Sequence, residues 1–530
     1  MIVFATLMGY YLSFSSDEVL LKKQAPSKSK LQRIWTTIKR NFGVCAQTNR
    51  KRILVPTILL FSLAIFMPLA TSGLCISTFS DKYGYYWLEV RRVSSTFTRW
   101  FDIEKVCPPG APCHIYTTVP EDTATAFFLN VHTHVDVKEI TVFYQERESY
   151  EKVGPDMKEK QGEMYEFKGV EELGKRSVHS VYINGLKEGT EYYLEVHYDG
   201  KKWAEKYYKT LPGPQSEQQI RIAMGGDVGS NYTVKYMNDQ VAKYSPDIIV
   251  IAGDAGYDEG LTSCYYSFDL FLWYFEEMYD QIGRLVPFVI GIGNHDIGYN
   301  ALANPTIESN EEGPMFYLFL PQHLPKNSKG GVEHRVPALN EREPYFYHIV
   351  GNTIQLSLDS GYIAPYDGKQ KAWIRETVMR HPEMARFANY HVPVYASCFK
   401  PLYDDDRAPL LAEEHWLPLF EELRFMTAFE NHVHFYKRTK PLIQGKEHPK
   451  GVLYLGDGAW GILPNTCKGT NKPRRSEFGI HEKAESLNHV WIVTLNQTIV
   501  RYEALGMDGK LIEEPIYQKI ADYKLDDSVL

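Results

Sequence analysis

Five short polar motifs decide the fold of this chain: Gly226-Asp227-Val228-Gly229, Gly253-Asp254-Ala255-Gly256-Tyr257, Gly293-Asn294-His295-Asp296, Tyr390-His391-Val392-Pro393 and His432-Val433-His434. Each of the first three follows an apolar run of strand length, at 221–225, 247–252 and 287–292. Stretches with helical spacing, 232–243 and 267–282, separate these runs. This order predicts parallel strands with helices on the sheet faces, and functional side chains of such sheets collect at the carboxyl ends of the strands. We therefore predict an α/β domain whose motifs meet at one edge of a sheet.

Further β-structure is predicted on both sides of these motifs. A hairpin is expected over 346–359, a strand at 451–455, and a pair of strands within 489–502 joined around Asn496. Upstream, 114–214 is rich in β-branched and aromatic residues, with turn signals such as Asn184-Gly185. Short strands at this spacing predict an all-β sandwich.

The N-terminal part predicts a membrane anchor. At 530 residues the chain has room for two or three domains, and its net charge of −8 gives no case for nucleic acid. Residues 22–52 carry ten Lys and Arg and no acidic residue, and 53–75 is uncharged and long enough to span a bilayer. The basic flank places the N-terminus in the cytosol and the rest outside or in a lumen. A buried core helix and a cleaved signal peptide are the alternatives.

Cysteines and sequons agree with an exported domain. Cys107 and Cys113 could close a tight loop as a disulfide, which persists in oxidising compartments, and an odd number of cysteines remains beyond the anchor. Asn231 and Asn496 each head an Asn-x-Thr sequon and are candidate glycosylation sites.

The motifs carry the residue types that bind metal ions. Carboxylate and amide oxygens suit hard cations, while imidazole suits zinc, iron and related ions. Asp227 and Asp254 follow predicted strands, and His432 and His434 would project from the same side of an extended segment. A single Gly-Asp or His-x-His is more often a turn or an accident, but five such features in this order predict a dinuclear metal site.

The order and content of the motifs resemble the metallophosphoesterase superfamily and, within it, the purple acid phosphatases. The family pattern is Gly-Asp-x-Gly, Gly-Asp-x-x-Tyr, Gly-Asn-His-(Asp/Glu), Val-x-x-His and Gly-His-x-His, and the resemblance covers about 219–505. It implies a four-layer α/β metallophosphoesterase sandwich, preceded as in the larger plant-type members by a fibronectin III-like β-sandwich. The predicted domains are a basic cytosolic tail (1–52), a transmembrane anchor (53–75), a stem (76–113), the β-sandwich (114–214), the catalytic domain (219–505) and a C-terminal tail (506–530).

The resemblance also implies roles for individual residues. Asp227, Tyr257 and His434 would hold a ferric ion. Asn294, His391 and His432 would hold a divalent zinc, manganese or iron, with Asp254 bridging the two ions. His295 would bind the phosphate or protonate the leaving alcohol. The implied activity is hydrolysis of phosphate monoesters by attack of a metal-bound hydroxide, as in an acid phosphatase.

Three departures from the family pattern bear on these expectations. Ala388 replaces the usual Val of the fourth motif, and Asn431 replaces the usual Gly before His432. Asn is the residue most able to adopt left-handed dihedrals after glycine, so the backbone can accommodate Asn431 there. Plant-type members carry a further histidine about nine residues after the one matched by His391, and this chain has Lys400 near that position. Lys400 is therefore a candidate phosphate-binding residue.

Two alternatives to a monoesterase stay open: a phosphodiesterase or nucleotide pyrophosphatase using the same site, and an adhesion or signalling ectodomain that has lost turnover. The expected substrate is a phosphorylated small molecule or a phosphoprotein, and a homodimer is a possible assembly. The expected location is a single-pass membrane protein whose catalytic domain lies in the secretory pathway, in a lysosome-like compartment or at the cell surface.

Overall fold

The computed structural model describes residues 75–79, 85–89, 107–167, 176–258, 265–297, 314–322, 344–397, 407–465 and 479–525. The chain divides into two compact units, 1–70 and 71–530, and every described residue belongs to the second. The predicted cytosolic tail and all of the predicted anchor except Cys75 lie outside the described residues. Within the described ranges, no helix combines the length and apolar content needed to cross a bilayer. Part of the predicted stem forms a hairpin of β1 (Cys75–Phe79) and β2 (Tyr85–Glu89).

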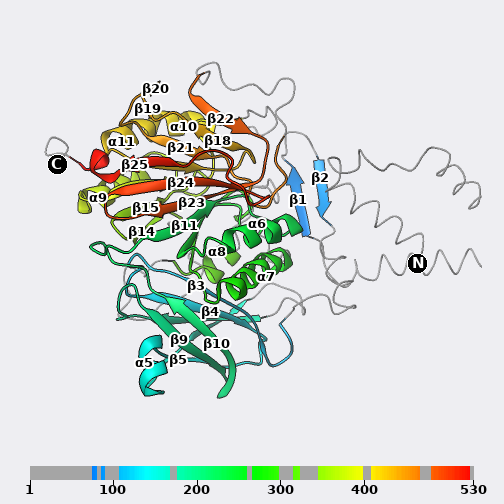
Figure 1. The fold of residues 1–530 in the computed structure, drawn as a ribbon. Helices are drawn as coiled ribbons and strands as arrows, with labels where there is room; N and C mark the ends of the chain where they lie inside the picture. Colours follow the sequence, from blue (N-terminus) through cyan, green and yellow to red (C-terminus); the bar gives the residue numbers. More distant parts are fainter. Residues whose placement is uncertain are drawn as a thin grey trace, which may run out of the picture. The chain divides into compact units, whose positions relative to one another are not determined.

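The region predicted as a β-sandwich consists of strands in two groups (Figure 1). One group has the order β3 (Pro112–Thr118), β4 (Phe127–Thr133), β8 (Arg176–Ile183), β7 (Glu163–Phe167). The other has the order β10 (Lys201–Lys209), β9 (Glu191–Tyr198), β5 (Ile140–Glu146), β6 (Lys158–Gln161), with the short helix α5 (Arg147–Val153) after β5.

The two groups pack against each other through apolar side chains. Phe127 of β4 stacks on Tyr208 of β10 with ring centroids 3.8 Å apart. The Tyr192 hydroxyl accepts a hydrogen bond from the Lys187 backbone N–H at 2.8 Å, the contact of a tyrosine corner in immunoglobulin-like sandwiches. The strand-rich character expected for 114–214 is therefore present, while its assignment as a fibronectin III-like module stays a prediction.

The first catalytic sheet contains the three strands that precede the first three motifs. β11 (Ile220–Gly225), β12 (Ile248–Ala252) and β13 (Phe288–Gly291) pair in parallel, as their sequence order predicts. Helices α6 (Tyr232–Ala242) and α7 (Tyr265–Ile282) connect them. β23 (His489–Leu495) and β24 (Ile499–Gly506) extend the sheet beyond β11 as an antiparallel hairpin. At its other edge β13 pairs with β3, so the sheet continues into the N-terminal strands.

The second catalytic sheet positions the last two motifs. Its order is β14 (Phe346–Val350), β15 (Thr353–Ser357), β16 (Ala385–Asn389), β17 (Thr427–Glu430), β21 (Leu453–Gly456), β18 (Tyr436–Thr439), β22 (His481–Glu485). Helices α9 (Gly368–Arg380), α10 (Arg407–His415) and α11 (Leu417–Glu422) belong to this half, and the short α8 (Pro314–Phe319) and the β19 (Leu442–Ile443)–β20 (Lys446–Glu447) hairpin complete the described elements.

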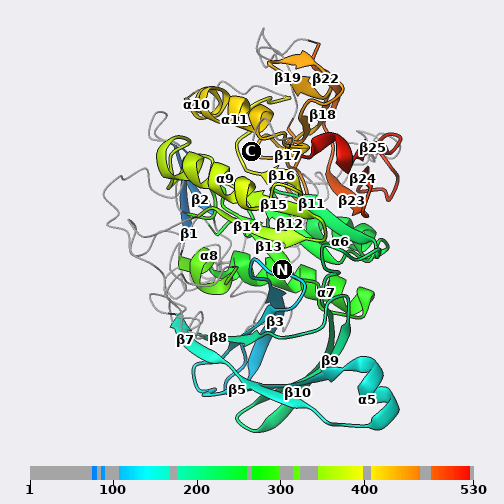
Figure 2. The same cartoon turned by 90° about the vertical axis from the view of Figure 1, so that its left-hand side faces the viewer.

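The catalytic half has the layer order helix, sheet, sheet, helix (Figure 2). Successive side chains of a strand point to opposite faces of its sheet. Phe387 and Phe429 accordingly join the core shared with the first sheet and with α6 and α7, whereas Ala388 and Ala428 join the core under α9, α10 and α11. This is the four-layer arrangement expected from the sequence.

The predicted C-terminal tail is part of the fold. β25 (Ile516–Lys519) pairs with β24 at the edge of the first sheet, and the 3-10 helix η5 (Ile520–Tyr523) follows it. Ile520 and Tyr523 are buried, while the β25 side chains alternate between half-buried and exposed. A polar edge strand has no continuous apolar run, which is why its sequence resembles a tail.

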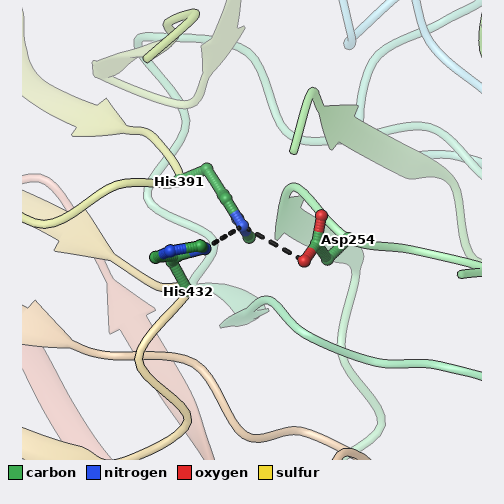
Figure 3. Close-up of side chains that lie close together, drawn as sticks. All are labelled: Asp254, His391 and His432. Carbon is green, nitrogen blue, oxygen red and sulfur yellow. Dashed lines mark hydrogen bonds and ion pairs between the residues drawn. The ribbon is translucent and has the colours of Figure 1, made fainter. Parts of the chain in front are cut away.

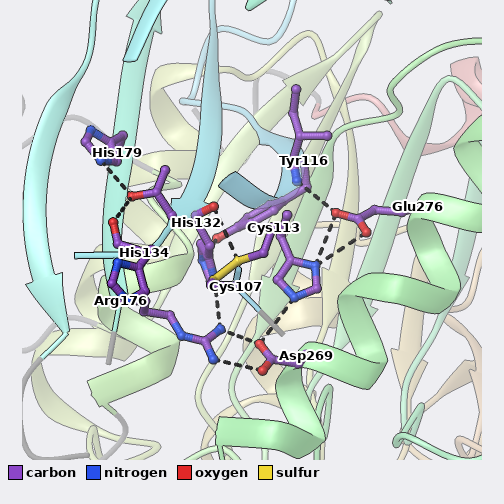
Figure 4. Close-up of a disulfide and its surroundings, with 12 residues drawn as sticks. Cys107, Cys113, Tyr116, His132, His134, Arg176, His179, Asp269 and Glu276 are labelled. Atoms are coloured by element: carbon purple, nitrogen blue, oxygen red, sulfur yellow. Dashed lines mark hydrogen bonds and ion pairs between the residues drawn. A yellow bond between two sulfur atoms is a disulfide. The ribbon is translucent and has the colours of Figure 1, made fainter. Parts of the chain in front are cut away.

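A disulfide and a charged cluster lie where the N-terminal strands meet α7 (Figure 4). Cys107 and Cys113 are bonded, as their spacing suggested. Arg176 of β8 forms a two-pronged ion pair with Asp269 of α7, and the buried His114 of β3 lies 3.3 Å from both Asp269 and Glu276. Ion pairs therefore link the two halves of the molecule beside their shared sheet.

Candidate metal centre

Asp227, Tyr257 and His434 converge from three different loops. Asp227 follows β11, Tyr257 lies in the loop after β12, and His434 precedes β18. The Asp227 Oδ1 atom lies 2.9 Å from His434 Nε2 and 3.3 Å from the Tyr257 hydroxyl, and that hydroxyl lies 3.1 Å from His434 Nε2. All three side chains are largely buried. The three residues predicted for the ferric subsite are thus brought together.

Asn294, His391 and His432 form a second group. Asn294 Oδ1 lies 3.0 Å from both His391 Nε2 and His432 Nδ1, and the two ring nitrogens are 3.2 Å apart. The rings of His391 and His432 meet edge to face, with centroids 5.0 Å apart. The three residues predicted for the divalent subsite therefore also meet.

Asp254 lies beside the second group (Figure 3). Its Oδ2 is 3.2 Å from His391 Nε2, and the potential ligand atoms of Asp254, His391 and His432 all lie within 4.8 Å of one another. Its Oδ1 accepts a hydrogen bond from the His295 backbone N–H at 2.8 Å, whereas the buried Oδ2 accepts none from the described residues. One carboxylate oxygen is thus oriented by the protein and the other faces the histidine nitrogens.

The donor set fits bound cations. The His391 Nδ1–H donates to the Ala252 carbonyl at 3.1 Å, so in the neutral ring its Nε2 presents a lone pair to Asn294 Oδ1 and His432 Nδ1. Lone pairs at such distances repel unless a proton or a cation lies between them. A backbone carbonyl behind a histidine is also the usual way of orienting a metal ligand.

The pKa values of His391 and His432 also indicate that this group of ligands favours a bound positive charge. Burial by itself would lower the pKa of His391, but the carboxylates of Asp254 and Asp227 raise it to about 9. Burial and the neighbouring His391 lower the pKa of His432 to about 3. Without a metal the two facing rings therefore carry one positive charge, held by His391, in a place where cations would satisfy all the ligands.

The loops that carry the ligands are held to one another by backbone hydrogen bonds. Beyond the ends of β11 and β12, the N–H groups of Asp227, Val228 and Gly229 donate to the carbonyls of Gly253, Asp254 and Ala255 at 2.8–3.2 Å. The parallel pairing thus continues past the strand ends, which places Asp227 and Asp254 side by side.

Asp296 organises the Asp254 loop, a role that the sequence did not reveal. Its carboxylate accepts hydrogen bonds from the backbone N–H groups of Asp254 and Gly293 at 2.7 Å and of Ala255 at 3.0 Å. Burial and the nearby Asp254 raise the pKa of Asp296 to about 7. In the sequence, Asp296 is the fourth residue of the Gly293-Asn294-His295-Asp296 motif, and that position alone does not indicate its role.

Asp359, just after β15, holds the loop that brings Tyr362 to the second group. Asp359 accepts backbone hydrogen bonds from Tyr362, Ile363 and Ala364 at 2.6–2.9 Å, and the Tyr362 hydroxyl donates to Asn294 Oδ1 at 3.4 Å. The sequence does not single out Tyr362, because tyrosine is too common in this chain for one to stand out.

His295, a predicted catalytic residue, is partly accessible to solvent. Its ring stacks on Tyr257 with centroids 4.2 Å apart, its Nε2 lies 3.9 Å from Asp254 Oδ2, and its side chain is 20% exposed against 0% for His391. It can therefore reach a bound substrate. Lys400, the other candidate, lies outside the described residues, so its role stays a prediction.

Asn431 replaces the usual glycine without adopting left-handed dihedrals. Asn431 is not among the non-glycine residues with positive φ, whereas His432 (73°) and His434 (57°) are. Its Nδ2 donates to the Tyr390 carbonyl at 3.1 Å, and its side chain packs against Gly226. The reversal of chain direction occurs at the histidines themselves, because both rings must turn toward the Asp227 and His391 sides.

Both candidate glycosylation residues have structural roles. Asn231 caps α6: its Oδ1 accepts from Thr233 N at 2.8 Å and its Nδ2 donates to the Gly461 carbonyl at 2.9 Å. Asn496 orders the turn between β23 and β24 by accepting from Thr498 N and Ile499 N at 2.9 Å. These contacts account for the two asparagines without a glycan, and glycosylation stays a prediction.

Comparison with known proteins agrees with the family resemblance of the motifs. Residues 220–420 match the family described as calcineurin-like phosphoesterase. Purple acid phosphatase 15 of Arabidopsis thaliana is 26% identical over 324 residues, which cover 56% of this chain and 56% of the relative. Purple acid phosphatase 21 of the same plant is 25% identical over 344 residues, covering 59% and 66%. The match thus spans less than two thirds of either relative's length.

Solved structures agree on the fold. The purple acid phosphatase PPD1 from yellow lupin (Lupinus luteus) seeds matches with a TM-score of 0.60 at 14% identity, covering 79% of this chain and 77% of that one. PhoD matches with a TM-score of 0.52 at 12% identity, covering 77% and 88%. At these identities the likeness shows a metallophosphoesterase fold. Together with the motifs and the curated relatives, it makes this chain similar to the purple acid phosphatases, with a segment at 220–420 that matches the calcineurin-like phosphoesterases.

Proposed function

We propose that the protein is a dinuclear-metal acid phosphatase that hydrolyses phosphate monoesters. The observation that carries the proposal is the convergence of seven ligand-type side chains into two adjacent groups, one of Asp227, Tyr257 and His434 and one of Asn294, His391 and His432, with Asp254 beside the second. Its relatives named purple acid phosphatases support the reaction class.

The first group would hold a ferric ion and the second a zinc, manganese or ferrous ion, with Asp254 bridging them. A phenolate from Tyr257 suits ferric iron, and the imidazoles of His391 and His432 suit a divalent transition metal. A pair of such cations supplies Lewis acidity that activates water and neutralises phosphate charge.

The chain's own residues would orient the substrate. His295 lies next to Asp254 and to the Tyr257 ring and has solvent access, so its imidazole can donate a hydrogen bond to a phosphate oxygen or to the leaving alcohol. The Tyr362 hydroxyl donates to Asn294, and its pKa is well above the usual value because of burial and the charge of Asp254, so it stays protonated and would orient that ligand. His295 thus provides a donor that does not depend on Lys400.

A substrate panel tests the proposal. The purified full-length chain should turn over p-nitrophenyl phosphate with an acidic optimum, and Asp254→Asn should lower kcat/KM by about 100-fold or more, because the carboxylate between the ligand groups loses its charge. Faster turnover of bis(p-nitrophenyl) phosphate than of the monoester would favour the phosphodiesterase alternative. Absence of turnover with a full metal complement would favour an ectodomain without catalysis.

The ferric assignment has its own test. A protein with iron bound to Tyr257 should be coloured by tyrosinate-to-iron charge transfer, and the visible band should vanish in Tyr257→Phe. A colourless parent protein with full activity would remove ferric iron from the proposal while leaving the dinuclear site.

We also propose that the catalytic domain lies outside the cytosol, behind a single-pass anchor at 53–75. The uncharged segment, its basic flank and the Cys107–Cys113 disulfide support this location, because structural disulfides persist in oxidising compartments. In sealed microsomes, added protease should leave a fragment that contains the catalytic domain; its complete digestion would contradict the topology.

A further inference from the structure

A buried network of three charged side chains lies next to the metal-ligand loops. Lys437 of β18 has its Nζ 2.7 Å from Asp457 Oδ1 and 2.5 Å from the Tyr395 carbonyl oxygen, and it also contacts Glu430 Oε2. The side chains of Lys437, Glu430 and Asp457 are all 0% exposed. Burial by itself would lower the pKa of Lys437, but Asp457 and Glu430 raise it, so the ammonium stays charged.

The two carboxylates use their other oxygens to hold the loop that follows β16. Glu430 Oε1 accepts from the Tyr390 hydroxyl at 2.6 Å and from the Val394 backbone N–H at 2.7 Å. Asp457 Oδ2 accepts from the Ser397 backbone N–H at 2.7 Å and from its hydroxyl at 2.5 Å. The loop bearing His391 is therefore attached to the network on both sides of that histidine.

The same network is attached to the loop that bears the other two histidines. Glu430 precedes His432 by two residues, and the Asp457 carbonyl accepts the His434 backbone N–H at 2.8 Å. Lys437 is thus the cation that joins carboxylates from the ends of β17 and β21, and through them the loops that carry His391, His432 and His434.

A purely structural role explains this network poorly. Well-packed apolar side chains usually stabilise a core at least as well as a buried ion pair, because two charges lose their hydration on burial. What fixed charges add is geometry, and a metal site requires its ligands within about 0.5 Å of their working positions. The charges here lie directly behind ligands that come from separate loops.

We propose that Lys437 is a positioning residue of the metal centre: by joining Glu430 to Asp457 it sets the separation between the His391 loop and the His432–His434 loop, and with it the affinity of the divalent subsite. The inference rests on the proposed function, since it assumes that the seven side chains bind metal. Lys437 would act through Glu430 and Asp457 and not as a ligand itself.

The test compares metal retention in full-length variants. In Lys437→Met a side chain of similar length removes the charge, and Lys440→Met is the matched control, because Lys440 forms an ion pair with the exposed Glu447 close to the same strand. After dialysis against graded EDTA, metal content is measured per chain and zinc is titrated back. Lys437→Met should bind zinc 10- to 100-fold more weakly than the parent chain, the loss typical when a partner behind a metal ligand is removed. Excess zinc should restore kcat with KM unchanged, and Lys440→Met should match the parent.

A second variant separates positioning from charge balance. Lys437→Met leaves two buried carboxylates unpaired and can fail to fold, whereas the triple variant Lys437→Met, Glu430→Gln, Asp457→Asn buries no charge and keeps the acceptors for Tyr390, Val394 and Ser397. Positioning by the ammonium predicts weakened zinc binding in the triple variant as well. Parent-like zinc affinity in the triple variant would overturn the inference alone. A parent chain that retains no metal would overturn the proposed function and this inference with it.

Discussion

Most of the predicted metal ligands have backbone conformations that L-amino acids rarely adopt. Five of the seven have positive φ angles: Asp227 (55°), Asp254 (54°), Tyr257 (54°), His432 (73°) and His434 (57°). Such conformations cost on the order of 1–3 kcal/mol each and persist only where the surroundings impose them. Here the hydrogen bonds between the loops impose them, and the result is that side chains from successive strand ends turn inward toward one another.

The space for these carboxylates depends on glycine. Gly293 has no positive φ, yet a Cβ there would lie 2.2 Å from Asp254 Oδ1 and 2.5 Å from its backbone nitrogen. Gly293→Ala should therefore displace Asp254 and lower both metal content and kcat by at least about 10-fold. Gly291→Ala is the control, because its Cβ would meet nothing closer than 3.6 Å. Metal content equal to the parent's in Gly293→Ala would contradict this explanation.

At the scale of elements, a charged cluster joins β3 and β8 to α7, and it makes stability depend on pH. Burial by itself would lower the pKa of His114, but Glu276 and Asp269 raise it to about 9. Burial, Arg176 and His114 keep the pKa of the adjacent His132 well below its usual value, so that ring is neutral. His114 is thus the imidazolium of the cluster.

The sign of the effect follows from proton linkage. Below the pKa of an unfolded histidine, about 6.5, His114 is protonated in both states and its full stabilisation is present. As pH rises through about 9 the folded state also loses the proton, and the stabilisation is lost. His114→Gln should therefore lower the free energy of unfolding by on the order of 3 kcal/mol near pH 6 and by much less at pH 10.

Urea unfolding of the parent and variant at several pH values measures this difference. His179→Gln serves as the control, because burial lowers the pKa of His179 to about 4 and its ring is neutral from pH 7 to 10. The difference in the free energy of unfolding between His179→Gln and the parent should be constant over that range. If the difference in the free energy of unfolding between His114→Gln and the parent is also independent of pH, His114 is not the charged member of the cluster.

At the scale of the whole described unit, the C-terminal segment connects the two catalytic sheets. β25 pairs with β24 of the first sheet, while the Tyr523 carbonyl of η5 accepts a hydrogen bond from Arg386 of β16 in the second. The Tyr523 hydroxyl donates to the Gly451 carbonyl at 3.2 Å. The segment that the sequence presented as a tail therefore stabilises the contact between the sheets.

Two tyrosines of this segment give a matched pair of variants. Tyr523 is 2% exposed and Tyr517 is 60% exposed. Tyr523→Ala should lower the free energy of unfolding by about 3 kcal/mol, and Tyr517→Ala by no more than about 0.5 kcal/mol. Urea midpoints measure both, and the metal content of folded Tyr523→Ala should equal the parent's because the hydrogen bonds of Tyr523 given above go to Arg386 and Gly451, which lie outside the ligand loops. Equal midpoints for the two variants would mean that the segment does not stabilise the fold.

Much of the fold and the ligand set could be predicted from the sequence because both depend on local patterns. The apolar runs at 221–225, 247–252 and 287–292 coincide within a residue or two with β11, β12 and β13. Parallel strands end at the same edge of a sheet, so a polar residue after each run had to lie near the others.

What the sequence could not predict are interactions between residues far apart in the chain. His114 and Glu276 are separated by 162 positions, and Lys437 meets partners on two other strands whose spacing has no periodic signature. The segment around His432 is a third such case: no local pattern indicates that the left-handed dihedrals occur at His432 and His434 and not at Asn431.

By itself, then, the sequence determined which side chains stand at the ends of which strands, because hydrophobic periodicity and turn residues act over a few positions. The tertiary structure alone decided how these loops are held in register, through Asp296, through the Lys437 network and through the continuous hydrogen bonding beyond β11 and β12. Those contacts exist only after the strands of each sheet have paired, because each joins residues that no local pattern relates.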